Sequence, residues 1–132
     1  MEDKNYKKIF VVKNKHLATT MESGTSPVLS TPALLCFMEN TCMDSILHIL
    51  NKDENKTKTC VGVKCELRHL KPCVIGNQIE CISELTHIEK KRYFFKIRAY
   101  YKDKLIGVCD HIRCLVPENF YKIWFYFNKK CI

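Results

Sequence analysis

Apolar residues between positions 34 and 50 recur with the spacing of one amphipathic helix. At about 100° per residue, one face collects Leu35, Cys36, Cys42, Met43, Ile46, Leu47, Ile49 and Leu50. The opposite side carries polar residues at intervals of four, namely Asn40, Asp44 and His48. The pattern predicts a helix with one buried and one solvated stripe, and it places Glu39 near the middle of the buried stripe.

Capping residues mark the ends of this helix. Ser30 or Thr31 can serve as the N-cap, and Pro32 fits the first helical position, where no backbone N–H is needed. The apolar run ends near residue 51, and the polar segment NKDENKTK that follows predicts a loop. Leu34 and Phe37 fall outside the main apolar stripe, so we expect them to meet a partner subunit or a lid.

From Lys58 onward the period changes to two, which is typical of a strand with one buried face. Odd positions are mainly apolar (Thr59, Val61, Val63, Cys65, Leu67), and even positions carry charge (Lys64, Glu66, Arg68). His69 continues the odd, inward set. We therefore expect a half-buried strand that ends with an imidazole on its core side.

Four further segments read as strands. They lie at residues 8–12, 77–85, 91–101 and 105–116, and the last three are separated by short turns typical of antiparallel hairpins. The segment ENFYKIWFYF after Pro117 is too aromatic for a free tail and predicts a short helix or edge strand that packs.

One long helix that is apolar over most of its surface needs to be covered on several sides. A curved antiparallel sheet of about five strands meets that need, so the pattern favours an α+β fold with a central helix. At 132 residues, the chain has the size of one domain, and we treat residues 1–132 as a single unit. Polar residues interrupt the apolar runs well short of the roughly 20 residues that cross a bilayer, so no membrane segment is expected.

Nine cysteines are present, but none forms a CxxC pair and several lie on apolar faces. Together with an N-terminus, MEDKNYKK, that lacks an apolar signal region, this favours a reducing cytoplasm and thiols that act as small hydrophobes. We expect neither a metal site nor a disulfide framework.

The formal net charge of +8 is spread over KNYKK, KNK, NKTK, EKKR and KDK. No compact basic stripe emerges, so a nucleic-acid partner is not favoured. A diffuse positive field suits any anionic partner, including the phosphates of a nucleotide-bearing molecule, and is also compatible with an ordinary solvated surface.

Two titratable residues, Glu39 and His69, are thus predicted on core-facing sides of different elements. A buried, unpaired carboxylate is costly, so Glu39 needs a charged or hydrogen-bonded partner, or has a chemical role. Thr31 adds a hydroxyl at the start of the helix, where the positive end of the macrodipole can polarise a carbonyl. Thr31 and Glu39 are about 12 Å apart along the helix axis, so a substrate or His69 would have to bridge them. A satisfied core histidine, a simple cap and a structural polar network remain alternatives.

Three segments resemble the fluoroacetyl-CoA thioesterase-like branch of the hotdog superfamily. SGTSPVLSTPALLCFMENTC is similar to its helix-entry motif, with Thr31 followed by Met38 and Glu39. GVKCELRHLKPCVIG resembles its strand that ends in His-Leu, here His69 and Leu70, with Gly76 seven residues beyond the His. IGVCDHIR resembles its last-strand pattern of Gly107, His111 and Arg113.

This resemblance implies the hotdog fold, a homodimer with active sites at the subunit interface, and a catalytic set of Thr31, Glu39 and His69. Glu39 would attack a thioester carbonyl directly or activate water as general base, and His69 would orient water or protonate the departing thiolate. His111 is interpreted as a structural residue. The expected substrate is a short or medium acyl-CoA, with CoA as part of the substrate and no separate cofactor.

One departure from the family concerns the segment before the helix, HLATTMESGTSPVL, which contains no aromatic residue where the fluoroacetyl-specific enzyme has a Phe-bearing lid. Selectivity for fluoroacetate is therefore not expected. A non-catalytic acyl-CoA sensor or binding module and a hotdog dehydratase remain alternative functions, and a tetramer remains an alternative to the dimer.

Overall fold

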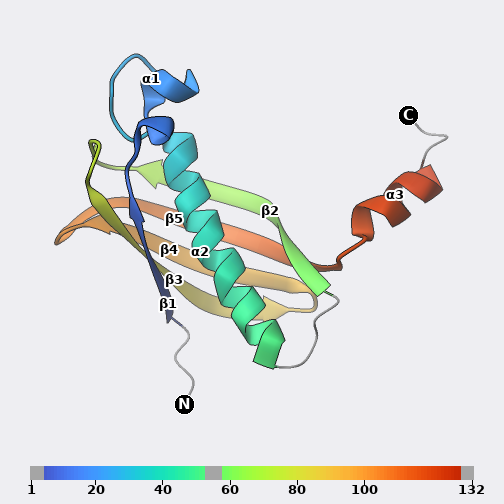
Figure 1. Ribbon diagram of the computed structural model, residues 1–132. Helices are drawn as coiled ribbons and strands as arrows, with labels where there is room; N and C mark the ends of the chain where they lie inside the picture. Colours follow the sequence, from blue (N-terminus) through green and yellow to red (C-terminus); the bar gives the residue numbers. More distant parts are fainter. Residues whose placement is uncertain (1–4, 53–57, 129–132) are drawn as a thin grey trace.

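The computed structural model describes residues 5–52 and 58–128, in which one long helix lies against a curved antiparallel sheet (Figure 1). In chain order the elements are β1 (Asn5–Val11), η1 (Asn14–His16), α1 (Ala18–Met21), α2 (Thr31–Lys52), β2 (Lys58–His69), β3 (Gln78–Glu89), β4 (Arg92–Tyr101), β5 (Lys104–Pro117) and α3 (Phe120–Asn128). The predicted strands and the long helix are confirmed. The stretch before α2 adds two short helices, η1 and α1, that were not predicted. The predicted loop after α2 lies largely outside the described residues.

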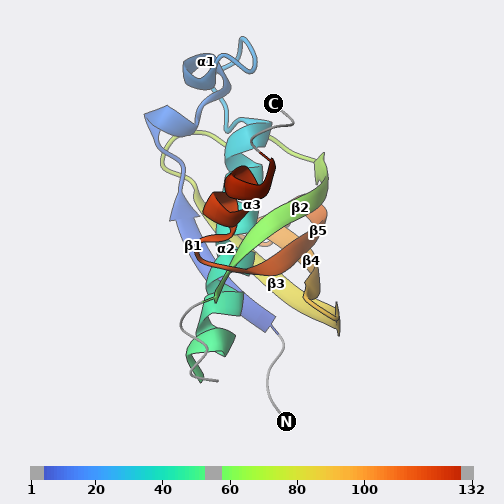
Figure 2. The same cartoon turned by 90° about the vertical axis from the view of Figure 1, so that its right-hand side faces the viewer.

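The five strands form one sheet in the order β1-β3-β4-β5-β2, with every pair antiparallel. Strands β3, β4 and β5 are joined by tight turns, as the sequence predicted. Strand β2 follows α2 in the chain but pairs with β5, so that β1 and β2 are the two edges. Figure 2 shows the sheet wrapped around α2 from β1 on one side to β2 on the other. This is the α+β arrangement that the polarity pattern predicted.

The side of α2 that faces the sheet differs from the predicted one. Leu34, Met38, Cys42 and Ile46 are fully buried, and Phe37 is nearly so, whereas Cys36 is exposed and Leu35 and Met43 are partly buried. Leu34 and Phe37 are therefore core residues of this chain, so the prediction that they meet a partner subunit or a lid is wrong. The projection failed because α2 also buries small polar residues. The Thr41 hydroxyl, for example, donates to the Phe37 carbonyl at 2.8 Å, which satisfies it inside the core.

The start of α2 follows the capping rule. The Ser30 side-chain oxygen accepts a hydrogen bond from the backbone N–H of Ala33 at 3.1 Å, so Ser30 is the N-cap. Thr31 is the first helical residue, and Pro32, predicted at that position, is the second. By length and composition alone, Thr31–Leu50 could cross a membrane, contrary to the expectation from its polar interruptions. Here this segment is the core helix that the sheet encloses.

Strand β2 changes register in its middle. Its pairing with β5 shifts between Gly62 and Lys64, so Val63 is an extra residue in the ladder. Cys60 and Gly62 therefore face α2 before the bulge, and the odd residues Cys65, Leu67 and His69 do so after it. The predicted inward set is right for the second half of the strand and wrong for Thr59, Val61 and Val63, because the bulge reverses which parity points inward.

The aromatic segment after β5 forms a helix, α3, that projects from the end of the sheet (Figure 1). A helix was one of the two predicted forms. The expected packing is not found within the described chain, where most of its large apolar side chains are exposed.

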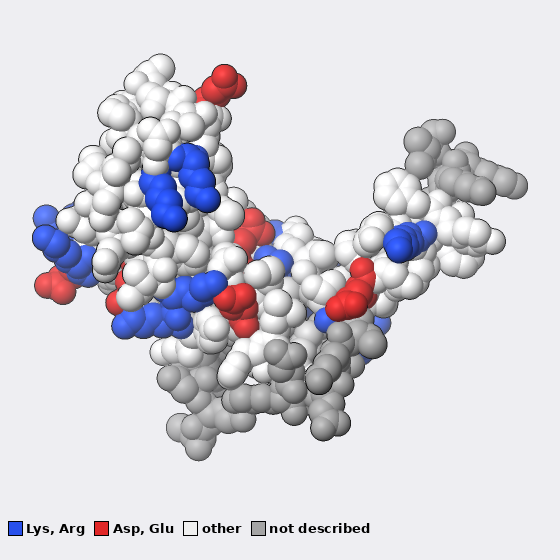
Figure 3. Space-filling model, in the orientation of Figure 1, with Lys and Arg blue, Asp and Glu red and all other residues white. Residues whose placement is uncertain are grey.

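Every cysteine that the structure describes is a free thiol. Burial raises the pKa of Cys81 and Cys109 to about 12, which keeps these thiols neutral and supports their role as small hydrophobes. Basic side chains on the face shown in Figure 3 form separate groups with acidic residues between them.

Close contact between α2 and the sheet depends on Gly107 in β5. A Cβ at this position would lie 2.8 Å from the Leu34 Cδ2 atom and 3.3 Å from the Met38 Cε atom. The missing side chain therefore lets the helix approach β5 at the level of its most buried residues.

We predict that Gly107→Val lowers the free energy of unfolding by about 1–3 kcal/mol, because the added methyl groups overpack this contact. The measurement is the midpoint of urea unfolding. Asp110→Asn, at an exposed position of the same strand, is the control and should change stability by less than about 0.5 kcal/mol. An unchanged midpoint in Gly107→Val would contradict the close packing.

Candidate active site

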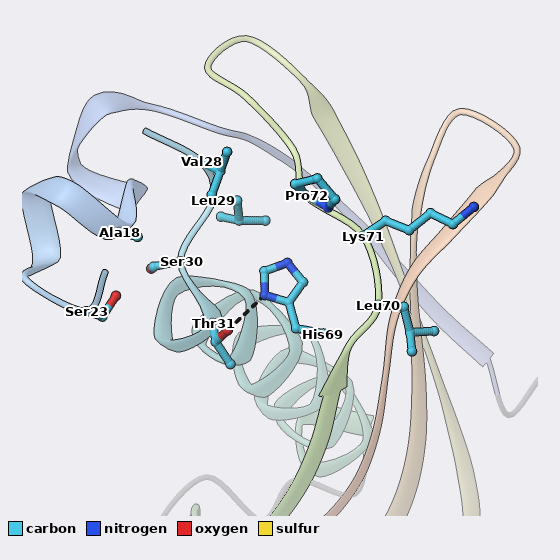
Figure 4. A pocket seen from close by; sticks show the side chains of 10 residues that line it. All are labelled: Ala18, Ser23, Val28, Leu29, Ser30, Thr31, His69, Leu70, Lys71 and Pro72. Carbon is cyan, nitrogen blue, oxygen red and sulfur yellow. Dashed lines mark hydrogen bonds between the residues drawn. The ribbon is translucent and has the colours of Figure 1, made fainter. Parts of the chain in front are cut away.

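A hydroxyl and an imidazole meet where α2 begins and β2 ends. The Thr31 Oγ1 atom lies 2.9 Å from the His69 Nδ1 atom. Figure 4 shows the imidazole between the segment that enters α2 and the segment that leaves β2. The N-terminus of a 22-residue helix adds a positive field at this point.

The second ring nitrogen of His69 is available for a ligand. Its Nε2 atom is buried and has no hydrogen-bond partner among the described residues. Burial lowers the pKa of His69, and the nearby backbone of Lys71 offsets this only in part, so the ring is neutral near pH 7. When the Thr31 hydroxyl donates to Nδ1, the ring proton lies on Nε2, which can then donate to a bound group.

A cavity of about 290 Å³ opens beside this pair. Besides Thr31 and His69, its lining comes from α1, from the segment between α1 and α2, and from the segment after β2: Ala18, Ser23, Val28, Leu29, Ser30, Leu70, Lys71 and Pro72. Its volume is at the lower limit of the roughly 300–1,000 Å³ found for small-molecule sites. One chain alone therefore offers a shallow pocket.

A second polar cluster lies further along α2 and surrounds Glu39. The Glu39 Oε2 atom is 3.4 Å from the Arg113 guanidinium and 3.8 Å from the His111 Nε2 atom. Both partners come from inward-facing positions of β5 and are almost completely buried, whereas the Glu39 side chain is 37% exposed. This geometry agrees with the expectation that Glu39 has a charged partner. The prediction that Glu39 lies near the middle of the buried face is wrong. Glu39 lies at the border of that face.

His111 holds the arginine rather than the carboxylate. Its Nδ1 atom lies 2.8 Å from the Lys64 carbonyl oxygen, to which it can only donate, and Arg113 donates to Nε2 at 3.1 Å. Both contacts require the neutral ring with its proton on Nδ1. Burial lowers the pKa of His111, and the Arg113 charge lowers it further, which favours the same form. The geometry agrees with the structural role expected for His111.

A glycine makes room for the Glu39 carboxylate next to β2. A Cβ on Gly62 would lie 2.6 Å from Glu39 Oε2 and 3.2 Å from His111 Cε1. The absent side chain thus lets the carboxylate reach the edge strand, where it is partly open to the surroundings.

Glu39, Cys65 and His111 place potential metal ligands within 4.8 Å of one another. Arg113 already contacts both the carboxylate and the His111 Nε2 lone pair. A metal ion there would have to displace a cation that satisfies the same groups, so the arrangement favours an ion pair with arginine over a metal centre.

Comparison with known proteins identifies the family. A family model described as the fluoroacetyl-CoA-specific thioesterase FlK matches residues 12–119. The chain belongs to the FlK family. No functionally curated protein matches the sequence.

Solved structures confirm the fold of this FlK-family protein. A point mutant of the fluoroacetyl-CoA-specific thioesterase FlK is similar with a TM-score of 0.83 and 18% identity, over 94% of this chain and 93% of that chain. A complex of that mutant with fluoroacetate and CoA gives a TM-score of 0.79 and 18% identity, over 89% and 95%. A Thermus thermophilus hypothetical protein of the thioesterase superfamily gives 0.83 and 23%, over 96% and 90%. At these identities the likeness shows the hotdog fold alone.

The three predicted site residues fall into two groups. Thr31 and His69 are in contact, whereas Glu39 pairs with Arg113 and His111, about 12 Å further along α2 by helical rise. Sequence reasoning missed the role of Arg113. Its alternation with Cys109, His111 and Leu115 on the buried side of β5 was the available signal, because an arginine in such a series needs a buried acidic partner.

We predict that the protein loses stability as pH falls below about 6.5. Burial lowers the pKa of His16, His69 and His111 from the ordinary value of 6.5, so the unfolded chain takes up protons that the folded chain resists. Stability should thus rise with pH through this range. Urea unfolding between about pH 5 and pH 7.5 measures the slope.

The variant His111→Asn isolates one of these contributions. It should show a smaller increase of unfolding free energy with pH than the wild type, whatever its absolute stability. An equal slope in the two proteins would contradict the desolvated, neutral state of His111.

Proposed function

We propose that this FlK-family chain hydrolyses a short or medium acyl-CoA thioester to a free acid and CoA. The observation that carries the proposal is the Thr31–His69 pair at a cavity beside the α2 N-terminus, in which the buried His69 Nε2 atom lacks a partner among the described residues. A buried polar atom without a hydrogen-bond partner in the protein is expected to find that partner in a bound ligand. A structural histidine would be expected to use both of its nitrogens.

Thr31 and His69 would act on the thioester itself. The carbonyl oxygen would lie near the α2 N-terminus, where the helix field stabilises the negative charge that develops during attack. The His69 Nε2–H group would orient the attacking water or donate to the departing sulfur. The thiolate is a good leaving group, so position and charge stabilisation would supply most of the rate increase.

The Glu39 carboxylate would act either as general base or as nucleophile. As general base it takes a proton from water while the new C–O bond forms and the C–S bond breaks. As nucleophile it forms an anhydride that water then opens. Arg113 supports either role because its guanidinium lies 3.4 Å from the carboxylate and holds it beside β2.

We further propose that two copies assemble through their β2 edges, so that the two clusters come together. An antiparallel pairing of β2 about its midpoint would set Lys58 opposite His69 of the partner subunit. Glu39 lies beside Gly62, seven residues from His69 along its own strand. In the dimer it would come level with Cys65 of the partner subunit, only four residues from the partner subunit's His69.

The lining of the cavity bears on the substrate. The residues before α2 that line it are small or aliphatic, which suits an acyl group without a fluoroacetyl-specific aromatic lid. Lys71 lies at its rim, and its ammonium group extends away from the imidazole in Figure 4. This position and the net charge of +8 suit the phosphates of CoA, which would be taken from the cytoplasm.

We predict thiol release from at least one member of a panel of acetyl- to octanoyl-CoA. Glu39→Gln should lower kcat/KM by about 10²–10⁴-fold, because it keeps the shape of the side chain and removes its charge. His69→Ala should lower it to a similar degree. Circular dichroism of both variants should match that of the wild type.

Ile88→Glu, at an exposed position of β3 remote from the cavity, is the control and should retain activity. Wild-type turnover in Glu39→Gln would rule out its assigned role. Tight binding of an acyl-CoA by the wild-type protein without cleavage would favour an acyl-CoA sensor instead.

A further inference from the structure

The C-terminal helix α3 presents an apolar face that the rest of the described chain does not cover. Phe120, Ile123, Trp124 and Phe127 fall on this face, and together with Pro117 they line an apolar hollow. Trp124 is 54% exposed and Phe127 is 75% exposed. Lys122 lies on the other side of the helix. Aromatic side chains bury about 150–250 Å² each when covered, so a face of this size normally has a partner.

A second apolar surface lies at the opposite end of β2. Leu70, Val74 and Ile75, just after this strand, are each about half exposed. Leu70 also lines the cavity of Thr31 and His69. The cavity thus borders on the uncovered side chain of Leu70, while the segment before α2 offers no aromatic residue to close it.

The position of α3 relates these two surfaces through a second copy of the chain. Pro117, three residues before α3, pairs with Lys58 at the start of β2. In the antiparallel dimer of two β2 strands, the end of β2 in the partner subunit lies at that same place. The α3 helix of one chain would therefore lie next to Leu70 of the partner subunit, and the second α3 would do the same by symmetry.

The shape of the molecule agrees with this arrangement. Figure 3 shows a wide concave surface between α3 and the rest of the described chain. Figure 2 shows α3 on the same side of the sheet as α2. The gap between α3 and the rest of the chain lies beside the edge strand β2, so a second copy of the chain could bind there. A monomer would instead leave both the edge of β2 and the apolar face of α3 exposed.

We infer that α3 packs on a second copy of this chain and forms an aromatic cover over the acyl end of that copy's Thr31–His69 cavity. This rests on the proposed dimer and on the proposed acyl-CoA substrate. Trp124 and Phe127 would be specificity-determining residues that contact the acyl chain, in place of an aromatic lid before α2. Each active site would then use residues from both chains, and its preference for acyl length would depend on α3.

The only tryptophan of the chain, Trp124, reports on this contact directly. In the 132-residue chain, at a concentration where sedimentation shows dimers, Trp124 should resist quenching by acrylamide and should emit at shorter wavelength than a solvated indole. A non-hydrolysable thioether analogue of a medium acyl-CoA should change its emission further. Leu70→Glu should restore quenching, because a charge on the receiving surface expels the apolar face of α3.

Ile88→Glu is the matched control, since Ile88 is exposed to the same degree as Leu70, at 51% against 49%, but lies on β3. It should leave the protection of Trp124 intact. A dimer in which Trp124 is quenched like a free indole would overturn the inference, and so would a protein that stays monomeric. Protection that appears only when anionic phosphatidylserine vesicles are added would also overturn it, because α3 would then bind a lipid surface. Thiol release is measured separately, so hydrolysis can stand or fail independently of the position of α3.

Discussion

Burial of α2 against the sheet is the constraint on which the rest of the molecule depends. Leu34, Met38 and Ile46 have no solvent exposure, and Gly107 lets the helix approach β5 at this level. The helix is therefore held along most of its length, and with it the two polar groups that lie at its exposed border. Thr31 reaches His69 and Glu39 reaches Arg113 because this packing sets the orientation of their helix. Side chains on such packed elements are already held in position before a ligand binds, so no binding energy is needed to order them.

The two clusters differ in their electrostatics, and the difference suits a shared reaction. In the Thr31–His69 pair, burial lowers the pKa of the imidazole and so favours its neutral form, and the pair lies at the positive end of a helix. The Glu39 cluster contains a carboxylate with a guanidinium, and a neutral histidine holds the guanidinium. Neither cluster alone has an anion, a proton donor and a cavity. The edge strand β2 lies beside both, which makes assembly through this edge the simplest way to combine them.

Much of the fold was predictable because local signals agreed with each other. The cap at Ser30, the apolar run of α2 and the hairpins of β3 to β5 each follow from residue types at fixed spacings. The orientation of α2 was not predictable in this way, because the helix also buries polar groups. Thr41, for example, makes its hydrogen bond within α2 itself. The bulge at Val63 was missed for a related reason. A single inserted residue reverses the inward parity and leaves no clear trace in composition.

For the candidate site, the sequence proposed Thr31, Glu39 and His69 but did not predict how they group in the structure. Thr31, Glu39 and His69 all lie at polar positions of the core border, yet their separation into two clusters depends on the angle between α2 and β2. Arg113 was visible only as a charge in an otherwise buried series of β5. The exposed face of α3 shows a further limit, since a pattern of apolar residues predicts that a face is covered without saying which chain covers it.

Mixing two inactive variants tests most directly whether the two clusters form one site across two chains. Glu39→Gln and His69→Ala chains are unfolded together in equal amounts and refolded, and thiol release is compared with that of each variant alone. In a mixed dimer, one of the two sites would combine the native Glu39 of one chain with the native His69 of the other. The account predicts recovery of about a quarter of the wild-type activity. A mixture as inactive as either variant alone would contradict it.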